Sequence, residues 1–214
     1  PDSRKVFKYS RLLVHWRLDE GKGDTIADSS GNGNKGTLRN GPQWVESPRG
    51  KALSFNGTNA YVEMSNNLSD LPIPFSISLW VNPAAKQMEH ADILGNHGEG
   101  FLGISLQQDG AHTNLYGFGL GDGKQWQGVG PVLLTSDAWQ HVAVVCDGEY
   151  GVLYLNGAEQ SKMPVKGALA PNPKQNFKLG QGYHTGRYFR GLLNDLRIHG
   201  RALSAAEIKG LADE

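Results

Sequence analysis

Three segments of the sequence combine aromatic rings with planar polar side chains in surroundings rich in glycine. They span residues 96–99, 121–128 and 180–190. One face of a sugar ring is a patch of C–H bonds that stacks on an aromatic ring, while its hydroxyl groups need hydrogen-bond donors and acceptors. The three segments therefore predict a carbohydrate ligand. The candidate ligand-binding residues are Trp126, Tyr183, His184, Arg187, Arg190 and His97.

Two of these residues, Arg187 and Arg190, favour a charged ligand. A guanidinium group matches the paired oxygens of a carboxylate or sulfate, so two converging arginines would suit an acidic polysaccharide. The alternative is that both are solvated surface residues. Trp126 has no apolar neighbours in the sequence, which indicates exposure. Other tryptophans lie within strand patterns and are expected to be packing residues: Trp16, Trp80 and Trp139.

A second cluster of chemistry-bearing residues occupies residues 28–34, Asp-Ser-Ser-Gly-Asn-Gly-Asn. Calcium prefers about six to eight oxygen ligands, and glycine lets the backbone curl around an ion. The segment is not an EF-hand loop, because its twelfth position is Arg39 rather than Glu. Asp195 is the natural further ligand, since strand parity places it on the face away from the core. The alternative is that Asp28 starts an Asx turn and Asp195 pairs with an arginine.

The scaffold that must position these residues is predicted to consist of β-strands. Apolar and polar residues alternate with a period of two along residues 12–18, 75–81 and 192–198, as in strands with one packed face. About ten short strands, separated by Asn-Gly and Asp-Gly turns, indicate a β-sandwich or barrel. Residues 204–207, Ser-Ala-Ala-Glu, form a capping box and predict a short C-terminal helix. In the last strand the expected inward set is Leu192, Asn194, Leu196 and Ile198.

Length, charge and cysteine content exclude several classes of protein. We assign residues 12–214 to one β-sandwich domain and residues 1–11 to an extension or linker. The chain has 21 basic and 21 acidic residues, which argues against a nucleic-acid binder or a polybasic membrane-surface protein. No apolar run is long enough for a membrane span. The one cysteine, Cys146, cannot form an internal disulfide.

Several stretches occur in an order typical of one family. They include residues 16–20 (Trp-Arg-Leu-Asp-Glu), 75–80 (Phe-Ser-Ile-Ser-Leu-Trp), 153–157 (Leu-Tyr-Leu-Asn-Gly) and 191–198 (Gly-Leu-Leu-Asn-Asp-Leu-Arg-Ile). Together they resemble the laminin-G-like jelly rolls of the concanavalin A type. This resemblance implies an all-β fold, an antiparallel two-sheet β-sandwich with a short C-terminal helix. It also implies a structural calcium ion beside the first and last strands, and the residues implicated are Asp28, Asn32, Asn56 and Asp195.

Folds of this kind carry both binding proteins and enzymes, so activity has to be judged from the residues. Retaining glycosidases need two carboxylates about 5–5.5 Å apart, and the acidic strand motif of sandwich glucanases is absent. Residues 177–183 are faintly similar to an alginate-lyase motif, but the partner strands of that motif are missing. The seven histidines show no metal-hydrolase spacing. We therefore expect no enzymatic activity.

The combined prediction is a non-catalytic carbohydrate-binding module with a structural calcium ion. We expect a secreted or cell-surface bacterial protein whose ligand is a polysaccharide, with catalytic domains covalently linked in a longer chain. Because the sequence does not begin with Met, we expect a mature form or a domain cut from that chain. The alternatives are an adhesion or scaffolding domain that binds protein, and a polysaccharide lyase or glycoside hydrolase of jelly-roll fold. The ligand is expected either on the concave face or at the loop ends.

Overall fold

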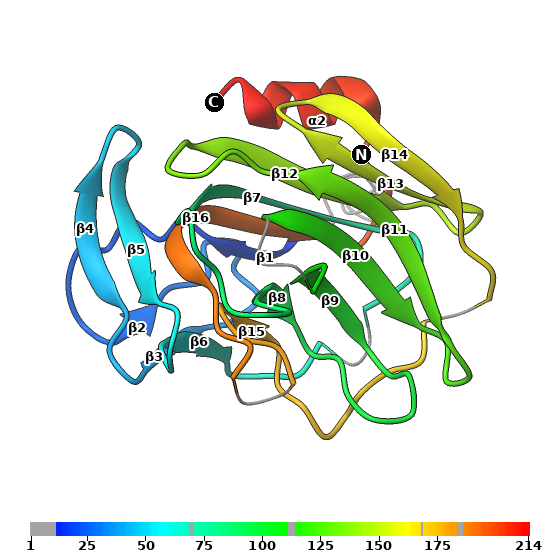
Figure 1. The fold of residues 1–214 in the computed structure, drawn as a ribbon, viewed down its shortest axis with the longest axis horizontal. Coiled ribbons are helices and arrows are strands. Elements are labelled where there is room, and N and C mark those ends of the chain that lie inside the picture. The colour runs from blue at the N-terminus through cyan, green and yellow to red at the C-terminus, as the bar shows by residue number, and fades with distance from the viewer. Residues whose placement is uncertain (1–11, 69–70, 111–113, 168, 184–185) are drawn as a thin grey trace, which may run out of the picture.

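In the part of the chain that the structure describes, two antiparallel β-sheets pack face to face, and one helix lies outside them (Figure 1). This arrangement confirms the predicted all-β sandwich with a short C-terminal helix. The predicted extension, residues 1–11, lies outside the described part of the chain. No described helix is long and apolar enough to span a bilayer. The computed structural model describes residues 12–68, 71–110, 114–167, 169–183 and 186–214.

The first sheet, here called the β7 sheet, has β7 and β16 near its centre. The strand order is β14-β13-β12-β7-β16-β5-β4, and β1 also pairs with β16. The first and last of the described strands therefore lie side by side, as the resemblance implied. The strands are β1 (Leu12–Trp16), β4 (Gln43–Ser47), β5 (Gly50–Asn56), β7 (Phe75–Pro83), β12 (Gln140–Cys146), β13 (Tyr150–Leu155), β14 (Ala158–Pro164) and β16 (Arg190–His199).

The second sheet, here called the β9 sheet, has the order β11-β10-β9-β8-β15-β6-β3-β2. Its members come from distant parts of the chain, so their pairing depends on the fold as a whole. The strands are β2 (Thr25–Ile26), β3 (Gly36–Arg39), β6 (Tyr61–Met64), β8 (Asp92–Gly95), β9 (Ile104–Gln108), β10 (Leu115–Gly121), β11 (Trp126–Leu133) and β15 (Lys178–Leu179).

Large aromatic and aliphatic side chains fill the space between the sheets. Burial of one such side chain contributes roughly 1.5–3 kcal/mol to stability. Trp16 is fully buried, as predicted, and its indole Nε1 donates a hydrogen bond to the carbonyl oxygen of Asn34 at 2.6 Å. That bond satisfies the one polar atom of the ring inside the core. The largest fully buried side chains include Trp16, Tyr116, Phe75, Phe118, Phe177 and Phe189.

The two other predicted packing tryptophans lie outside this core. Trp80 is only 9% exposed, but it occupies the outer face of β7, opposite the inward Leu79 and Val81. The guanidinium carbon of Arg49 lies 3.5 Å from the centre of its ring, which is a cation–π contact. Trp139, just before β12, is half-buried.

The strand parity expected for residues 192–198 is wrong over half of this segment. Leu193 is fully buried in the core, together with Leu196 and Ile198, whereas Leu192 is half-buried. The reason is a β-bulge between Asn194 and Arg197, where the backbone of Asp195 adopts φ = +51°. One extra residue reverses the inward and outward faces of the strand.

The helix α2 (Ala205–Ala212) begins at the predicted capping box. The hydroxyl of Ser204 accepts a hydrogen bond from the backbone N–H of Glu207, whose carboxylate accepts one from the backbone N–H of Ser204. Ile208 is fully buried against the outer face of β12 and β13. The helix therefore covers the side of the β7 sheet that faces away from the β9 sheet (Figure 1).

A buried histidine on the outer face of the β7 sheet predicts acid sensitivity. His141 is 2% exposed, and burial lowers its pKa from 6.5 to about 4. The folded state disfavours the protonated ring. Titration of His141 therefore does not reduce the free energy of unfolding above pH 6.5, and it reduces that free energy progressively as the pH falls towards 4. Between pH 7 and 4.5, we expect the free energy of unfolding to fall by about 2 kcal/mol less in His141→Gln than in the wild type.

Urea unfolding of both proteins at the two pH values measures this difference. His90→Gln is the matched control, because the His90 side chain is 39% exposed. An equal pH dependence in the wild type and in His141→Gln would show that His141 is not responsible.

Candidate functional site

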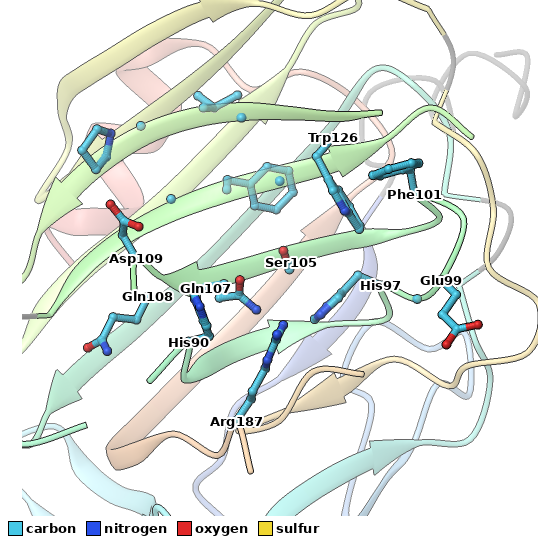
Figure 2. A pocket seen from close by; sticks show the side chains of 18 of the residues that line it. His90, His97, Glu99, Phe101, Ser105, Gln107, Gln108, Asp109, Trp126 and Arg187 are labelled. Atoms are coloured by element: carbon cyan, nitrogen blue, oxygen red, sulfur yellow. The ribbon is translucent and has the colours of Figure 1, made fainter. Parts of the chain in front are cut away.

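A groove of about 690 Å³ lies on the outer face of the β9 sheet, over β9, β10 and β11 (Figure 2). Strand alternation explains its position. Ile104 and Leu106 of β9 point into the core, so the intervening Ser105 and the following Gln107 point outward and line the groove. The residues lining the groove are 90, 97–101, 105, 107–109, 117–119, 126, 128–131 and 187.

The floor of this groove is formed by glycine backbone. On β10, Tyr116 and Phe118 are buried, and the alternate residues Gly117 and Gly119 line the groove. On β11, Gly128 also lines the groove, and a Cβ atom added to it would meet no atom within 4 Å. The floor is therefore an open surface of backbone with few side chains rising from it.

Two exposed aromatic rings stand at one end of the floor. Trp126 is 38% exposed and Phe101 is 42% exposed, and their ring centres lie 6.4 Å apart in an edge-to-face contact. Trp126 is the first residue of β11, and a Cβ on Gly119 would lie 3.5 Å from its ring. The loop with Phe101 is tied to the end of β10, because the N–H of Gly123 donates to the carbonyl oxygen of Phe101 at 2.9 Å.

A buried carboxyl group supports the polar centre of the groove. Asp92, on β8, has an exposed fraction of 0%. Its Oδ1 accepts a hydrogen bond from Nε2 of Gln107 at 3.0 Å, and its backbone N–H donates to the carbonyl oxygen of Arg187 at 3.0 Å. Burial raises the pKa of Asp92 well above its usual value, although the bond from Gln107 and the charge of Arg187 oppose this change. Asp92 thus holds two groove residues from below.

The structure brings together three of the predicted ligand-binding residues. Trp126, His97 and Arg187 all line the groove. The ring of His97 lies 5.8 Å from that of Trp126 and 6.3 Å from that of Tyr183, so Tyr183 adjoins the site. Their role as ligand contacts stays a prediction. His184 lies outside the described residues.

Arg190 is not among the residues that line the groove. It is the first residue of β16, where it pairs with Asn56, and its side chain packs on Gly57. The convergence of Arg187 and Arg190 that would favour an acidic ligand is therefore not present in the groove.

Sequence reasoning missed several groove residues, chiefly the floor. Residues 116–121 read Tyr-Gly-Phe-Gly-Leu-Gly, an alternation of bulky apolar residues with glycine. That pattern signals a strand with one core face and one bare face. The remaining polar residues carried no distinctive motif, and only the fold collects them. The missed groove residues with side chains include His90, Phe101, Ser105, Gln107 and Asp109.

The predicted calcium loop is held by hydrogen bonds. The carboxylate of Asp28 accepts them from the backbone N–H groups of His15 and Ser30 at 3.0 Å and of Asn34 at 2.9 Å. Burial opposes ionisation of Asp28, but hydrogen bonds from Ser30, His15 and Asn34 lower its pKa overall. Nδ2 of Asn32 donates to the carbonyl oxygen of Leu12 at 2.8 Å. These hydrogen bonds hold the loop against the first strand.

The other two implicated residues have different surroundings. Asp195 accepts a hydrogen bond from the ring Nε2 of His15 at 2.8 Å and forms an ion pair with Arg197 at 2.8 Å. It therefore shares a neighbour with Asp28. Asn56 lies at the far end of β5, where its Oδ1 accepts three backbone N–H groups of the following turn.

Among the described residues, no group of three His, Cys, Asp or Glu side chains could hold a metal ion. The hydrogen bond from the Ser30 N–H to Asp28 and the ion pair of Asp195 with Arg197 are the contacts that the alternative named. Calcium binding at this loop stays a prediction of the sequence.

We expect Asp28→Ala to lower the free energy of unfolding by about 1–3 kcal/mol, because three backbone N–H groups lose their acceptor. Thermal unfolding with excess calcium and with a chelator tests the ion in the same experiment. A calcium site at Asp28 requires that the chelator lower the Tm of the wild type but not of the variant. An unchanged wild-type Tm would contradict calcium binding there.

Comparisons with known proteins agree with this architecture. The family model described as the concanavalin A-like lectin/glucanases superfamily matches residues 56–209. No curated protein matches the chain. Domain 4 of AbnA, a GH43 extracellular arabinanase from Geobacillus stearothermophilus solved with arabinotriose, has 22% identity and a TM-score of 0.74, covering 94% of this chain and 98% of that domain.

Two clostridial toxin domains are similar over about half their own length. The binding domain of Paraclostridial Mosquitocidal Protein 1 has 19% identity and a TM-score of 0.75, with 94% of this chain and 52% of that chain covered. The binding domain of Botulinum Neurotoxin DC, solved with SialylT, has 14% identity and a TM-score of 0.74, with 95% and 51% covered. The matched family model spans most of the sequence, and the chain therefore belongs to the concanavalin A-like lectin/glucanase superfamily.

Proposed function

We propose that this chain binds a polysaccharide, without cleaving it, in the groove on the outer face of the β9 sheet. The observation that carries the proposal is the bare glycine floor next to the exposed rings of Trp126 and Phe101. A sugar ring has a flat apolar face and a rim of hydroxyl groups. The floor accommodates the ring, and the two aromatic side chains offer surfaces on which its C–H groups can pack.

Polar side chains around the floor supply partners for the hydroxyl groups. Ser105 can donate and accept hydrogen bonds, Gln107 offers an amide, and Arg187 offers several N–H donors. These groups lie towards the middle of the groove, whereas Trp126 and Phe101 stand at one end (Figure 2). A ligand of more than one sugar unit would contact both regions.

The similar structures support the wider proposal. One of them is a domain of an extracellular arabinanase in complex with arabinotriose. We propose by analogy that this chain is likewise an appendage of a secreted bacterial protein, holding linked catalytic domains on their polysaccharide substrate. The match covers 98% of the length of that domain, so a single module is compared with a single module.

The acidic residues of the groove do not resemble a glycosidase pair. Glu99 and Asp109 lie at opposite ends of the groove (Figure 2). Retaining glycosidases need carboxyl groups about 5–5.5 Å apart, and inverting enzymes about 6.5–9.5 Å apart around a water molecule. Asp92 is buried beneath the floor with no exposed surface. This arrangement supports binding without hydrolysis.

One observation favours a second candidate, a polysaccharide lyase. Arg187 and His97 line the same groove, and Tyr183 is in ring contact with His97. A lyase needs a group that neutralises the substrate carboxylate, a base and an acid, roles that Arg, His and Tyr can fill. Incubation with uronic-acid polysaccharides decides between the two: a rise in ultraviolet absorbance from unsaturated ends would establish the lyase, and its absence supports binding alone.

Trp126→Ala tests the aromatic end of the groove. Loss of one stacking surface is expected to weaken polysaccharide binding about 3- to 10-fold, as measured by affinity electrophoresis or calorimetry. Tyr150→Ala is the matched control, since Tyr150 is also 38% exposed but lies on β13 of the other sheet. Equal weakening by both substitutions would contradict binding at Trp126.

Gly128→Val tests the floor itself. The added side chain has open space and the backbone of Gly128 is not in the left-handed region, so the variant is expected to fold. The side chain would rise from the floor and weaken binding about tenfold or more, because a shaped site loses affinity when its volume is filled. Gln160→Val, at an exposed position of β14, should bind like the wild type. Wild-type affinity of Gly128→Val would place the ligand elsewhere.

A further inference from the structure

The charges around the groove point to the class of polysaccharide that it takes. Among the described lining residues, Arg187 is the one Lys or Arg, while Glu99 and Asp109 are both acidic. With the histidines neutral and Asp92 protonated, these groups carry a formal charge of −1, and ionisation of Asp92 would make it −2. The groove is therefore not a cationic surface in either state, and a polyanion entering it would meet net repulsion.

Arg187 interacts with the buried acidic residue Asp92 in the absence of a ligand. The backbone N–H of Asp92 donates to the carbonyl oxygen of Arg187, and the guanidinium charge acts on the buried carboxyl group. Whenever Asp92 is ionised, a ligand carboxylate would have to compete with it for this cation. Arg190, which could have formed a second arm of a carboxylate clamp, packs on Gly57 away from the groove lining.

The orientation of Gln107 favours hydroxyl groups over carboxylates. One N–H of its Nε2 is engaged by Oδ1 of Asp92 at 3.0 Å, which leaves the amide oxygen and the second N–H for a ligand, a pair that suits a hydroxyl group. An amide oxygen accepts a hydrogen bond from a sugar hydroxyl but repels a carboxylate oxygen. Asp92 is thus a positioning residue, which holds the amide of Gln107 through one of its N–H groups.

We infer that the groove selects neutral polysaccharides over those rich in uronic acid or sulfate. This inference rests on the proposed function, because it specifies the ligand of the same site. Arg187 then acts as a hydrogen-bond donor to hydroxyl oxygens. The sequence suggested an acidic ligand on the basis of Arg187 and Arg190. Because Arg187 lines the groove and Arg190 does not, we propose a neutral ligand instead.

The test uses pairs of polysaccharides that differ in charge alone. Polygalacturonate and alginate are each compared with their carboxyl-reduced forms, and neutral arabinan and xylan are added. We expect binding among the neutral chains, at least tenfold tighter than to any acidic parent, with less than a twofold change between 20 and 500 mM NaCl. An acidic parent that binds more tightly than its reduced form, with affinity that falls in salt, would overturn the inference while keeping the proposed function. Binding to no polysaccharide would overturn both.

A variant pair gives a second measurement. Glu99→Gln combined with Asp109→Asn removes both acidic lining residues, and the ratio of acidic to neutral affinity is expected to rise at least threefold. Glu149→Gln combined with Glu159→Gln makes the same change in net charge at exposed positions in the turn between β12 and β13 and on β14, away from the groove. If both double variants shift the ratio equally, the selection comes from overall charge rather than from the groove, and the inference fails.

Discussion

Side-chain alternation along β10 is the constraint on which both the core and the groove depend. Tyr116, Phe118 and Leu120 fill the space between the sheets, and the residues between them are glycines. Any register slip would move the large side chains into the groove and leave a void in the core. The same strand therefore stabilises the sandwich and clears the surface where a ligand can lie. Packing on one face and openness on the other are two results of one sequence pattern.

The fold was largely predictable, because its signals are local. Alternation along residues 75–81 and the capping box at Ser204 were read correctly, and the order of family stretches identified the sandwich. The bulge at Asp195 was not predictable in this way. A single residue with φ = +51° changes which side of β16 faces inward, and Asp is one of the few non-glycine residues that tolerates that conformation. Parity arguments fail wherever such a residue interrupts a strand.

The lining of the groove was predictable in part, since residue type drew attention to Trp126, His97 and Arg187. Its floor and its polar centre depend on the pairing of β8 with β9 and of β10 with β11, which is set by contacts between distant segments. Asp92 shows this most clearly. In the sequence it is one acidic residue before an apolar strand, and only the fold places it beneath Gln107 and Arg187.

The helix α2 and the groove occupy opposite faces of the sandwich. Ile208 packs on the outer face of β12 and β13, whereas the groove opens on the outer face of the β9 sheet. Lys209, exposed on this helix, is thus a convenient attachment point for a dye or a sensor surface. A protein immobilised there would present its groove to solution. The two-sheet architecture thereby places the attachment point and the groove on opposite faces of the protein.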